Sequence, residues 1–286
     1  MPNLKDIHKR HSTYQDSLIY RFESGLRNVV GKAQSRVISQ LHDRLKITDG
    51  VIDPSPKNLV LLRNAGKLFM AELDKAGYQE LVQAFLKQWN GTLPFLQETI
   101  EFLGEQVDQP WKDLKFTSKD LNLLNGIKAS TVDMLDSAMT TVAGTAVTRG
   151  LFGVAGLRFG ALVETLTEKF QLGIGRARSI ADTAMSTWYR TAADRAFQAI
   201  AADLPQHELK YRYSGPDDKL TRPFCRHMLA VDKAYTRDQI EKMDNGQLPN
   251  VFLTCGGWNC RHQWVMDTQG VEEFLKEPAV AQREAA

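Results

Sequence analysis

The sequence predicts a mainly α-helical protein that ends in a small α+β module rich in cysteine and histidine. Two observations lead to this fold class. Through the first 200 residues, apolar side chains recur every three or four positions, which is the period of one helix face. From Leu209 to Tyr213 the period changes to strict alternation, which is typical of a strand, and all three cysteines follow this change.

The N-terminal segment is predicted to form one long amphipathic helix. Its apolar residues are spaced to line one face: Leu18, Phe22, Leu26, Val29, Ala33, Val37, Leu41 and Leu45. Asp49-Gly50, Pro54 and Pro56 then end the helix, because proline lacks an N–H group and restricts the residue before it. Such a stripe either packs on the rest of the chain or is offered to a partner. The docking interpretation assigns partner binding to Phe22, Leu26, Val29, Val37 and Leu41.

Charge is uneven along the chain. The whole sequence has a net charge of only +2, so it is not a polycation that coats nucleic acid. Residues 1–46, however, carry nine Lys or Arg against four acidic residues. This excess fits either an acidic protein or DNA as a partner, or a solvated helix face.

Residues 58–202 are predicted to form further helices. Two or three helices are expected up to about residue 109, with breaks at Asn90-Gly91 and Pro94. Thr117 and Asp120 have the spacing of a capping box, so another helix is expected to begin there. The glycine-rich stretch 144–160 is expected to break this helix, and Gly173-Ile174-Gly175 to separate a short helix, 161–170, from a long one, 176–202.

After Pro205 we expect a compact α+β unit. It contains strands near 209–213 and 261–266, and a short helix near 237–243 that follows a capping box of Thr236 and Gln239. The predicted organisation is therefore a long helix with its linker at 1–56, a helical domain at 57–204, and the small module with a polar tail at 205–286. The N-terminal residues are polar, so we expect no secretion signal, and no segment is apolar enough for a membrane span.

The C-terminal module carries the chemistry of the chain. Cysteines clustered in a protein without a secretion signal indicate a metal site or free thiols before a disulfide. Zinc takes four thiolate or imidazole ligands, and modules of this size often need a bound metal ion to stabilise their fold. Five residues are candidates for those places, so at least one is a bystander: Cys225, His227, Cys255, Cys260 and His262. Buried thiols with hydrogen-bonded histidines, or a disulfide, are the alternatives.

Catalytic interpretations of the same residues are weaker. Cys225 and His262 could pair as nucleophile and base, and Asp217 or Asp218 could join His262 at a hydrolytic metal. Neither pattern is specific, so no catalytic residue is predicted and the chain is expected not to be an enzyme.

Charged residues near the module are expected to be structural. Arg222 lies close to Asp217 and Asp218, and an ion pair there would brace the loop. On the preceding helix, Arg178, Asp182 and Arg190 are expected to pair with one another, to contact that loop, or to be solvated.

Three separated motifs resemble the phage Mu F-like minor head proteins. They are the helix Gly175–Thr183, the D-x-x-T-R-x-x-C segment Asp218–Cys225, and the run Gly256–His262, which ends in Asn-Cys-Arg-His. They occur in the family's order and cover roughly residues 160–266. This chain has Asp182-Thr183-Ala184 where the family helix usually carries Arg-Thr-Glu, so a helix-to-loop ion pair is not carried over.

The resemblance implies a head morphogenesis protein of a tailed phage. Such proteins associate with the portal vertex, are packaged in the particle, and in some cases accompany DNA on ejection. It implies the portal protein as partner, with the major capsid or scaffolding protein and packaged DNA as further partners, and a location in the virion after assembly in the host cytoplasm. It also makes Cys225, Cys260 and His262 the favoured site residues, completed by His227 or Cys255. The competing hypothesis is a metal-dependent DNA-binding protein or nuclease, supported by basic residues around the cluster: Lys210, Arg212, Arg222, Arg226 and Arg261.

Overall fold

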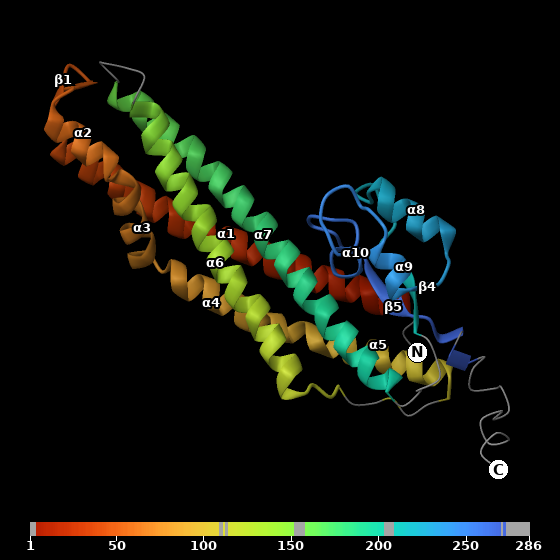
Figure 1. Cartoon of the computed structure of the whole chain (residues 1–286). Helices are drawn as coiled ribbons and strands as arrows, with labels where there is room; N and C mark the ends of the chain where they lie inside the picture. Colours follow the sequence, from red (N-terminus) through yellow and green to blue (C-terminus); the bar gives the residue numbers. More distant parts are fainter. Residues whose placement is uncertain are drawn as a thin grey trace, which may run out of the picture. The chain divides into compact units, whose positions relative to one another are not determined.

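The structure is a computed structural model that describes residues 4–108, 111, 114–151, 158–202, 209–269 and 271–272, with the backbone alone for 142–151. It confirms a mainly helical chain with a small Cys/His-rich α+β module near its C-terminus (Figure 1). The long helices are α1 (Leu4–Arg44), α6 (Ser118–Leu151) and α7 (Phe159–Ala201). None of the helices in the described ranges combines the length and hydropathy that crossing a bilayer requires.

Shorter elements connect and follow these helices. Between α1 and α6 lie β1 (Ile47–Thr48), β2 (Val51–Ile52), α2 (Pro56–Arg63), α3 (Ala65–Lys75), α4 (Tyr78–Gln88), the 3-10 turn η1 (Trp89–Thr92) and α5 (Leu93–Gln106). After α7 come β3 (Lys210–Ser214), α8 (Pro223–Val231), β4 (Tyr235–Thr236), α9 (Arg237–Glu241), α10 (Val251–Thr254) and β5 (Gln263–Met266).

The chain forms two compact units, each assembled from separate stretches. Unit 1 contains Met1–Asp16, Trp89–Lys128 and Asp182–Ala286, and unit 2 contains Ser17–Gln88 and Ala129–Ala181. The long helices α1, α6 and α7 each contribute residues to both units. The boundaries predicted at 56/57 and 204/205 therefore do not coincide with the boundaries of these units.

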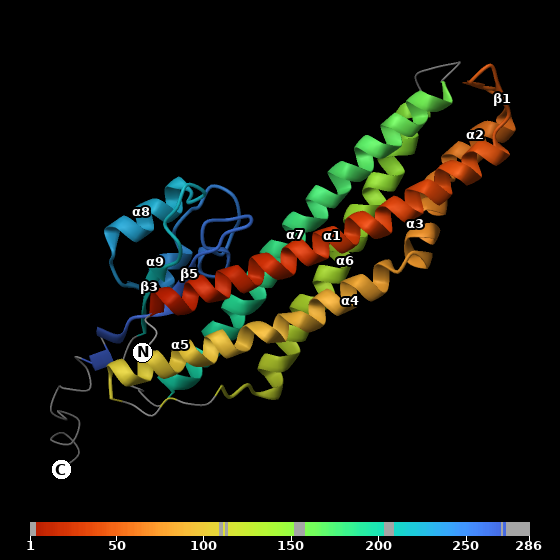
Figure 2. The same ribbon diagram turned by 180° about the vertical axis from the view of Figure 1, so that it is seen from behind.

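Unit 2 has an apolar helical interior. Phe22 of α1 stacks on Phe85 of α4 with ring centroids 4.4 Å apart, and Phe69 of α3 stacks on Phe170 of α7 at 4.0 Å. Polar contacts on its surface join α1 to α7, where Arg178 pairs with Glu23 and Gln34 donates to the hydroxyl of Thr167. Figure 2 shows the path of α1 and α4 in this unit.

The apolar stripe of α1 is part of this interior. All five residues assigned to partner docking are buried: Phe22, Leu26, Val29, Val37 and Leu41. This corrects the docking interpretation, because a side chain already covered by the chain's own helices offers no surface to a partner. The exposed side of α1 carries the basic residues instead, and every Lys and Arg between residues 4 and 46 is exposed.

The predicted turn after the first helix is confirmed, whereas the predicted break at Gly173–Gly175 is absent. The Asp49-Gly50 segment is the turn of a short antiparallel hairpin between β1 and β2, with both residues at positive φ (53° and 76°) as hairpin turns of this kind require. The Gly173–Gly175 segment does not interrupt α7, which is continuous because Ile174 is buried in unit 2 and its packing offsets the weak helix propensity of glycine. The break expected within 144–160 falls mostly outside the described residues, although α6 continues to Leu151.

In unit 1, the first residues of α1 place polar side chains in the interior. His8 Nδ1 lies 2.8 Å from the hydroxyl of Ser214, and His11 stacks on Tyr189 of α7 with ring centroids 3.8 Å apart. Gln15 donates to Asp182 at 3.0 Å and also to Ser186. Burial lowers the pKa of His8 to about 4, and burial together with the charges of His8 and Arg190 lowers the pKa of His11 to about 3.

The C-terminal module is built on a three-stranded antiparallel sheet in the order β4-β3-β5. Tyr213 of β3 lies opposite Trp264 of β5. The capping box of Thr236 and Gln239 is present at the start of α9, and that of Thr117 and Asp120 precedes α6. Both helix starts were therefore predicted correctly from local sequence.

Candidate metal centre

Three buried donor atoms meet in the C-terminal module. They are the Sγ atoms of Cys225 and Cys260 and a ring nitrogen of His262, all within 4.8 Å of one another. Cys225 lies in the first turn of α8, which begins with Pro223, while Cys260 and His262 lie in the segment that leads into β5. These three side chains could hold a metal ion.

The distances between the donors fit a tetrahedral ion. The two Sγ atoms are 3.8 Å apart, and Cys260 Sγ is 3.6 Å from His262 Nδ1. For tetrahedral zinc with bonds of about 2.3 Å to sulfur and about 2.0 Å to nitrogen, sulfur atoms stand about 3.8 Å apart, and sulfur and nitrogen about 3.5 Å apart. The distances from Cys260 Sγ to the other two donors are thus close to those that tetrahedral zinc requires.

A hydrogen bond fixes which nitrogen of His262 faces the sulfurs. Nε2 lies 2.8 Å from the carbonyl oxygen of Pro216, which can only accept, so Nε2 carries the proton and donates. In the neutral ring, Nδ1 then has a free electron pair directed toward Cys260. A carbonyl partner on the second nitrogen is the usual arrangement for a metal-binding histidine.

The two cysteines are electrostatically different. The hydrogen bond between the two sulfurs lowers the pKa of Cys260 and raises that of Cys225, so Cys260 loses its proton more readily than Cys225. The contact with His262 and the charge of Arg190 lower the pKa of Cys260 further. Gly256 also donates its backbone N–H to Cys260 Sγ at 3.2 Å. Cys260 therefore favours the thiolate form that binds metals, whereas Cys225 favours the thiol.

Gly256 allows the close approach of the backbone to the cluster. A Cβ atom at this position would lie 2.2 Å from Cys225 Sγ and 3.2 Å from Cys260 Sγ. No side chain fits there without displacing a sulfur, so the glycine is required by space.

Arg190 of α7 holds the loop that carries the ligands. Its guanidinium is buried and donates to three carbonyl oxygens, those of His262 and Leu253 at 2.9 Å and that of Cys260 at 2.5 Å. Two of these carbonyls belong to the candidate ligands. The loop that Arg190 contacts is therefore that of residues 253–262 and not the loop of Asp217 and Arg222 considered from sequence, and the contacts are hydrogen bonds and not ion pairs.

Other contacts join the motif segments. The backbone N–H of Asn259 donates to the hydroxyl of Thr183 on α7 at 3.1 Å, and Arg261 pairs with Asp218 at 2.7 Å. Arg261 lowers the pKa of Asp218 to about 2. Arg222 donates to the carbonyl of Gly256 at 2.9 Å. Asp218 and Arg222 both brace loops, as predicted, but through Arg261 and Gly256 and not through each other.

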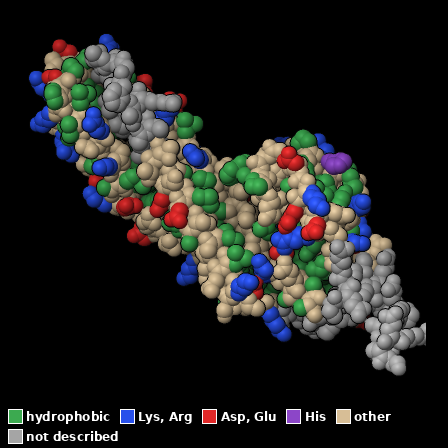
Figure 3. All heavy atoms as spheres, in the orientation of Figure 1, with side chains coloured by type: hydrophobic (Ala, Val, Ile, Leu, Met, Phe, Trp, Pro, Cys, Tyr) green, Lys and Arg blue, Asp and Glu red, His purple; other side chains and the backbone are tan. Residues whose placement is uncertain are grey.

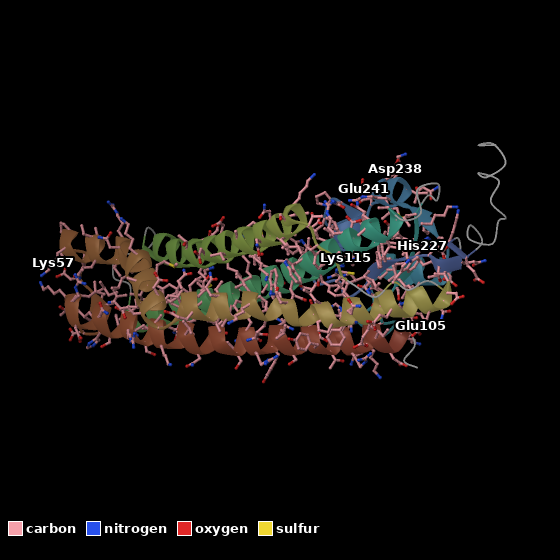
Figure 4. The ribbon with its side chains drawn as sticks, turned by 90° about the horizontal axis from the view of Figure 1, so that it is seen from below. Lys57, Glu105, Lys115, His227, Asp238 and Glu241 are labelled. Atoms are coloured by element: carbon pink, nitrogen blue, oxygen red, sulfur yellow. The ribbon has the colours of Figure 1, made fainter. Side chains whose placement is uncertain are left out.

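Two of the five predicted ligands lie outside the cluster. Cys225 and His227 are two residues apart on helix α8, so their side chains point to different sides of it. His227 is exposed (Figure 4). Cys255 is fully buried, but its Sγ faces the carbonyl of Phe252 at 4.0 Å. Burial raises the pKa of Cys255 to about 12, which favours an inert thiol.

The contacts of the described residues do not support the two catalytic interpretations. The sulfur in hydrogen-bond contact with His262 is that of Cys260 and not that of Cys225. Asp218 faces Arg261, and the donor cluster found among the described residues contains neither Asp217 nor Asp218.

Sequence reasoning missed the strand residue that touches the cluster. The hydroxyl of Tyr213 donates to Cys225 Sγ at 3.3 Å and lies 3.7 Å from Cys260 Sγ. Burial raises the pKa of Tyr213 well above its usual value. Strand alternation indicated that Tyr211 and Tyr213 share one face, but no local signal showed that this face meets the cysteines. The buried His8, His11 and Gln15 were also missed, although they continue the spacing of the apolar stripe toward the N-terminus.

Comparison of this chain with protein-family models, with curated proteins and with solved structures returned no match.

Proposed function

We propose that this chain is a minor head protein of a tailed phage, that it docks at the portal vertex during head assembly, and that it is packaged in the particle. The C-terminal module would be a structural unit whose fold is stabilised by bound zinc, and not a catalytic centre. The observation that carries the proposal is the contact between the three motifs that resemble the Mu F-like proteins. Thr183, Asp218 and Cys225 contact Asn259, Arg261 and Cys260, so motif residues far apart in sequence serve one local structure.

The choice of zinc follows from the donors. Two thiolates and an imidazole select zinc over magnesium or calcium, which prefer oxygen ligands. The spacing of the donors agrees with tetrahedral zinc, and the carbonyl of Pro216 holds the histidine in the required tautomer. We expect about one zinc per chain in a tag-free preparation, and none after Cys260→Ser.

The exposed basic side of α1 is the docking surface that fits this function. Lys32 and Arg44 are exposed on it, and the segment carries more positive than negative charge. Such a surface suits an acidic face of the portal, and the attraction would weaken with salt. The surface replaces the buried apolar stripe as the site of partner binding.

The nuclease or DNA-binding alternative has less support. Two of the five basic side chains around the cluster are neutralised by carboxylates, because Arg212 pairs with Asp267 and Arg261 pairs with Asp218. On the face of the module visible in Figure 3, basic and acidic side chains are interspersed. A cluster of arginines without acidic neighbours would favour DNA binding, and no such cluster is visible on that face.

The test is co-purification of the full chain with the portal protein of the same phage. We expect association at low salt, and its loss in the double variant Lys32→Glu/Arg44→Glu. The matched control is Lys57→Glu/Arg63→Glu, which reverses two exposed cations on α2 and should leave association unchanged. Failure of the unmodified chain to bind the portal, together with retention or cleavage of DNA in the presence of metal, would replace this proposal by the alternative.

A further inference from the structure

We propose that the phenolic oxygen of Tyr213 is the fourth ligand of the metal ion held by Cys225, Cys260 and His262. The inference rests on the zinc binding proposed above and completes its coordination. Tyr213 lies on β3, outside the motifs that supply the other three donors. Its participation gives a closed site of two thiolates, one imidazole and one phenolate, as a structural role requires.

The distances place this oxygen at a corner of the tetrahedron. It lies 3.3 Å from Cys225 Sγ and 3.7 Å from Cys260 Sγ. With a bond of about 2.0 Å to oxygen and about 2.3 Å to sulfur, tetrahedral zinc separates the two kinds of donor by about 3.5 Å. The two observed distances lie on either side of this value, so the oxygen needs to move by only a few tenths of an ångström.

The ring of Tyr213 is held in this position from three sides. It stacks on His262, with centroids 5.3 Å apart and planes within 5° of parallel. Trp264 contacts it edge-on at 4.7 Å from the neighbouring strand, and Phe224 does so at 6.0 Å from α8. A donor fixed by packing before the ion arrives costs little ordering entropy on binding.

The other predicted donors do not fill the fourth place. The Sγ of Cys255 faces the carbonyl of Phe252, and His227 is exposed on α8. The backbone of Gly256 closes the cluster beside the sulfurs and offers them only an N–H group. Tyr213 supplies a side-chain oxygen in contact with both sulfurs, which gives it the place that these residues leave.

Binding exchanges protons for the ion. Zinc accepts one electron pair each from the two sulfurs, from Nδ1 of His262 and from the oxygen of Tyr213. The protons still bound to the thiols and the proton of the phenol pass to solvent. No bond to carbon forms or breaks, and no electron is transferred. The competing role for Tyr213 is that of a hydrogen-bond donor to a thiolate, in a site whose fourth position is taken by water.

The experiment compares the full-length chain with Tyr213→Phe, which keeps the packed ring and removes the oxygen. Tyr211→Phe is the matched control, because Tyr211 is buried on the same face of β3 and packs on Phe252 without a sulfur contact among its described interactions. Each protein is titrated with zinc and followed by the ultraviolet difference signal of a metal-bound phenolate. Each is also loaded with cobalt(II), and its visible spectrum is recorded with and without added cyanide.

We expect the phenolate signal in the unmodified chain and in Tyr211→Phe, and its loss in Tyr213→Phe. We expect cyanide to alter the cobalt spectrum of Tyr213→Phe only, because only that variant has an open position. Zinc affinity should fall in Tyr213→Phe by more than the roughly 10- to 100-fold loss that is typical of an outer-shell partner. A cobalt spectrum that responds to cyanide in the unmodified chain, with no phenolate signal, would mean that water is the fourth ligand and would overturn the proposal.

The outcomes separate this inference from the proposals on which it rests. An unmodified chain that binds neither zinc nor cobalt overturns both the metal centre and the role of Tyr213. A chain that binds zinc but gives the water-ligand result overturns the role of Tyr213 alone. Portal association is measured independently of either result.

Discussion

The interior of unit 2 and the interior of the C-terminal module are held together by different interactions. In unit 2, aromatic and aliphatic side chains from α1, α3, α4 and α7 stack on one another, as Phe69 does on Phe170. In the module, two cysteines, a histidine and a tyrosine meet, and a buried arginine holds the surrounding carbonyls. Dispersion and hydrophobic burial stabilise the first interior, whereas the second depends on donor atoms with a defined geometry.

This difference has a consequence for what each region tolerates. An apolar interior accepts small changes of shape at a cost that grows with the cavity. A cluster of donors fails when one donor is lost, because the remaining polar atoms stay buried without their partner.

Cys260→Ser should abolish metal binding and with it the zinc-dependent part of the stability. At zinc a thousandfold above its dissociation constant, that part amounts to about 4 kcal/mol. The measurement is the free energy of unfolding with and without zinc, followed by hydrogen exchange in β3 and β5. Stabilisation of Cys260→Ser by zinc to the same extent as the unmodified chain would show that the metal binds elsewhere.

The matched variant in unit 2 is Phe69→Ala. It removes a fully buried ring and should cost about 4 kcal/mol through the cavity that it leaves. This loss should be the same with and without zinc, and it should appear in the hydrogen exchange of α3. A zinc-dependent loss would contradict the division of the two interiors.

Arg190→Met should destabilise the module by about 3 kcal/mol, because three carbonyl oxygens lose their donor. Zinc affinity should fall as well, since two of those carbonyls belong to Cys260 and His262. Arg195→Met is the control on the same helix. Arg195 is partly exposed and pairs with Asp120 at 3.6 Å, so its loss should cost less than about 1 kcal/mol and leave zinc binding intact.

Acid should weaken unit 1 through its buried histidines. The folded protein keeps His8 and His11 neutral, whereas the unfolded chain binds protons near pH 6.5, so stability is lost as the pH falls from about 6.5 toward 4. His11→Phe keeps a ring against Tyr189 and removes one titrating group. Between pH 7 and pH 5 it should therefore lose about 2 kcal/mol less than the unmodified chain. Titration of the His11 imidazole above pH 6, observed by NMR, would refute this explanation.

Thr236→Ala should have the smallest effect, about 1 kcal/mol, because it removes only the cap of the short helix α9. Zinc binding should not change. The variant tests whether local interactions in the module act independently of the metal, and a loss of zinc would show that they do not.

Most features that depend on local sequence were predicted correctly, with the break at Gly173–Gly175 as an exception. The spacing of Leu18, Phe22 and Leu26 predicted the long helix, and Thr117 and Thr236 predicted two helix starts. The change of period at Leu209 predicted the strand that became β3. Each of these signals spans only a few residues, so the sequence contains all the information that the prediction needs.

Features that depend on contacts between distant residues were not predicted. The same stripe that predicted α1 could not reveal that the chain covers it, because the covering residues lie in α4 and α7. His227 was a ligand candidate because it lies two residues from Cys225, but Pro223 begins a helix on which the two side chains point to different sides. Three of the five predicted metal ligands, Cys225, Cys260 and His262, lie together in the structure. Tyr213, which contacts the two sulfurs, lies on β3, where the sequence has no motif.

The assembly of unit 1 from three stretches of chain has a consequence for folding during synthesis. His8 meets Ser214 across 206 positions of sequence, and Gln15 meets Asp182 across 167. Unit 2 needs nothing beyond Ala181, so its helices can pack while the ribosome is still producing the module. The first turn of α1 therefore waits for the partner of His8 until β3 has emerged, and we expect His8 to remain exposed to solvent in a nascent chain stalled before Ser214.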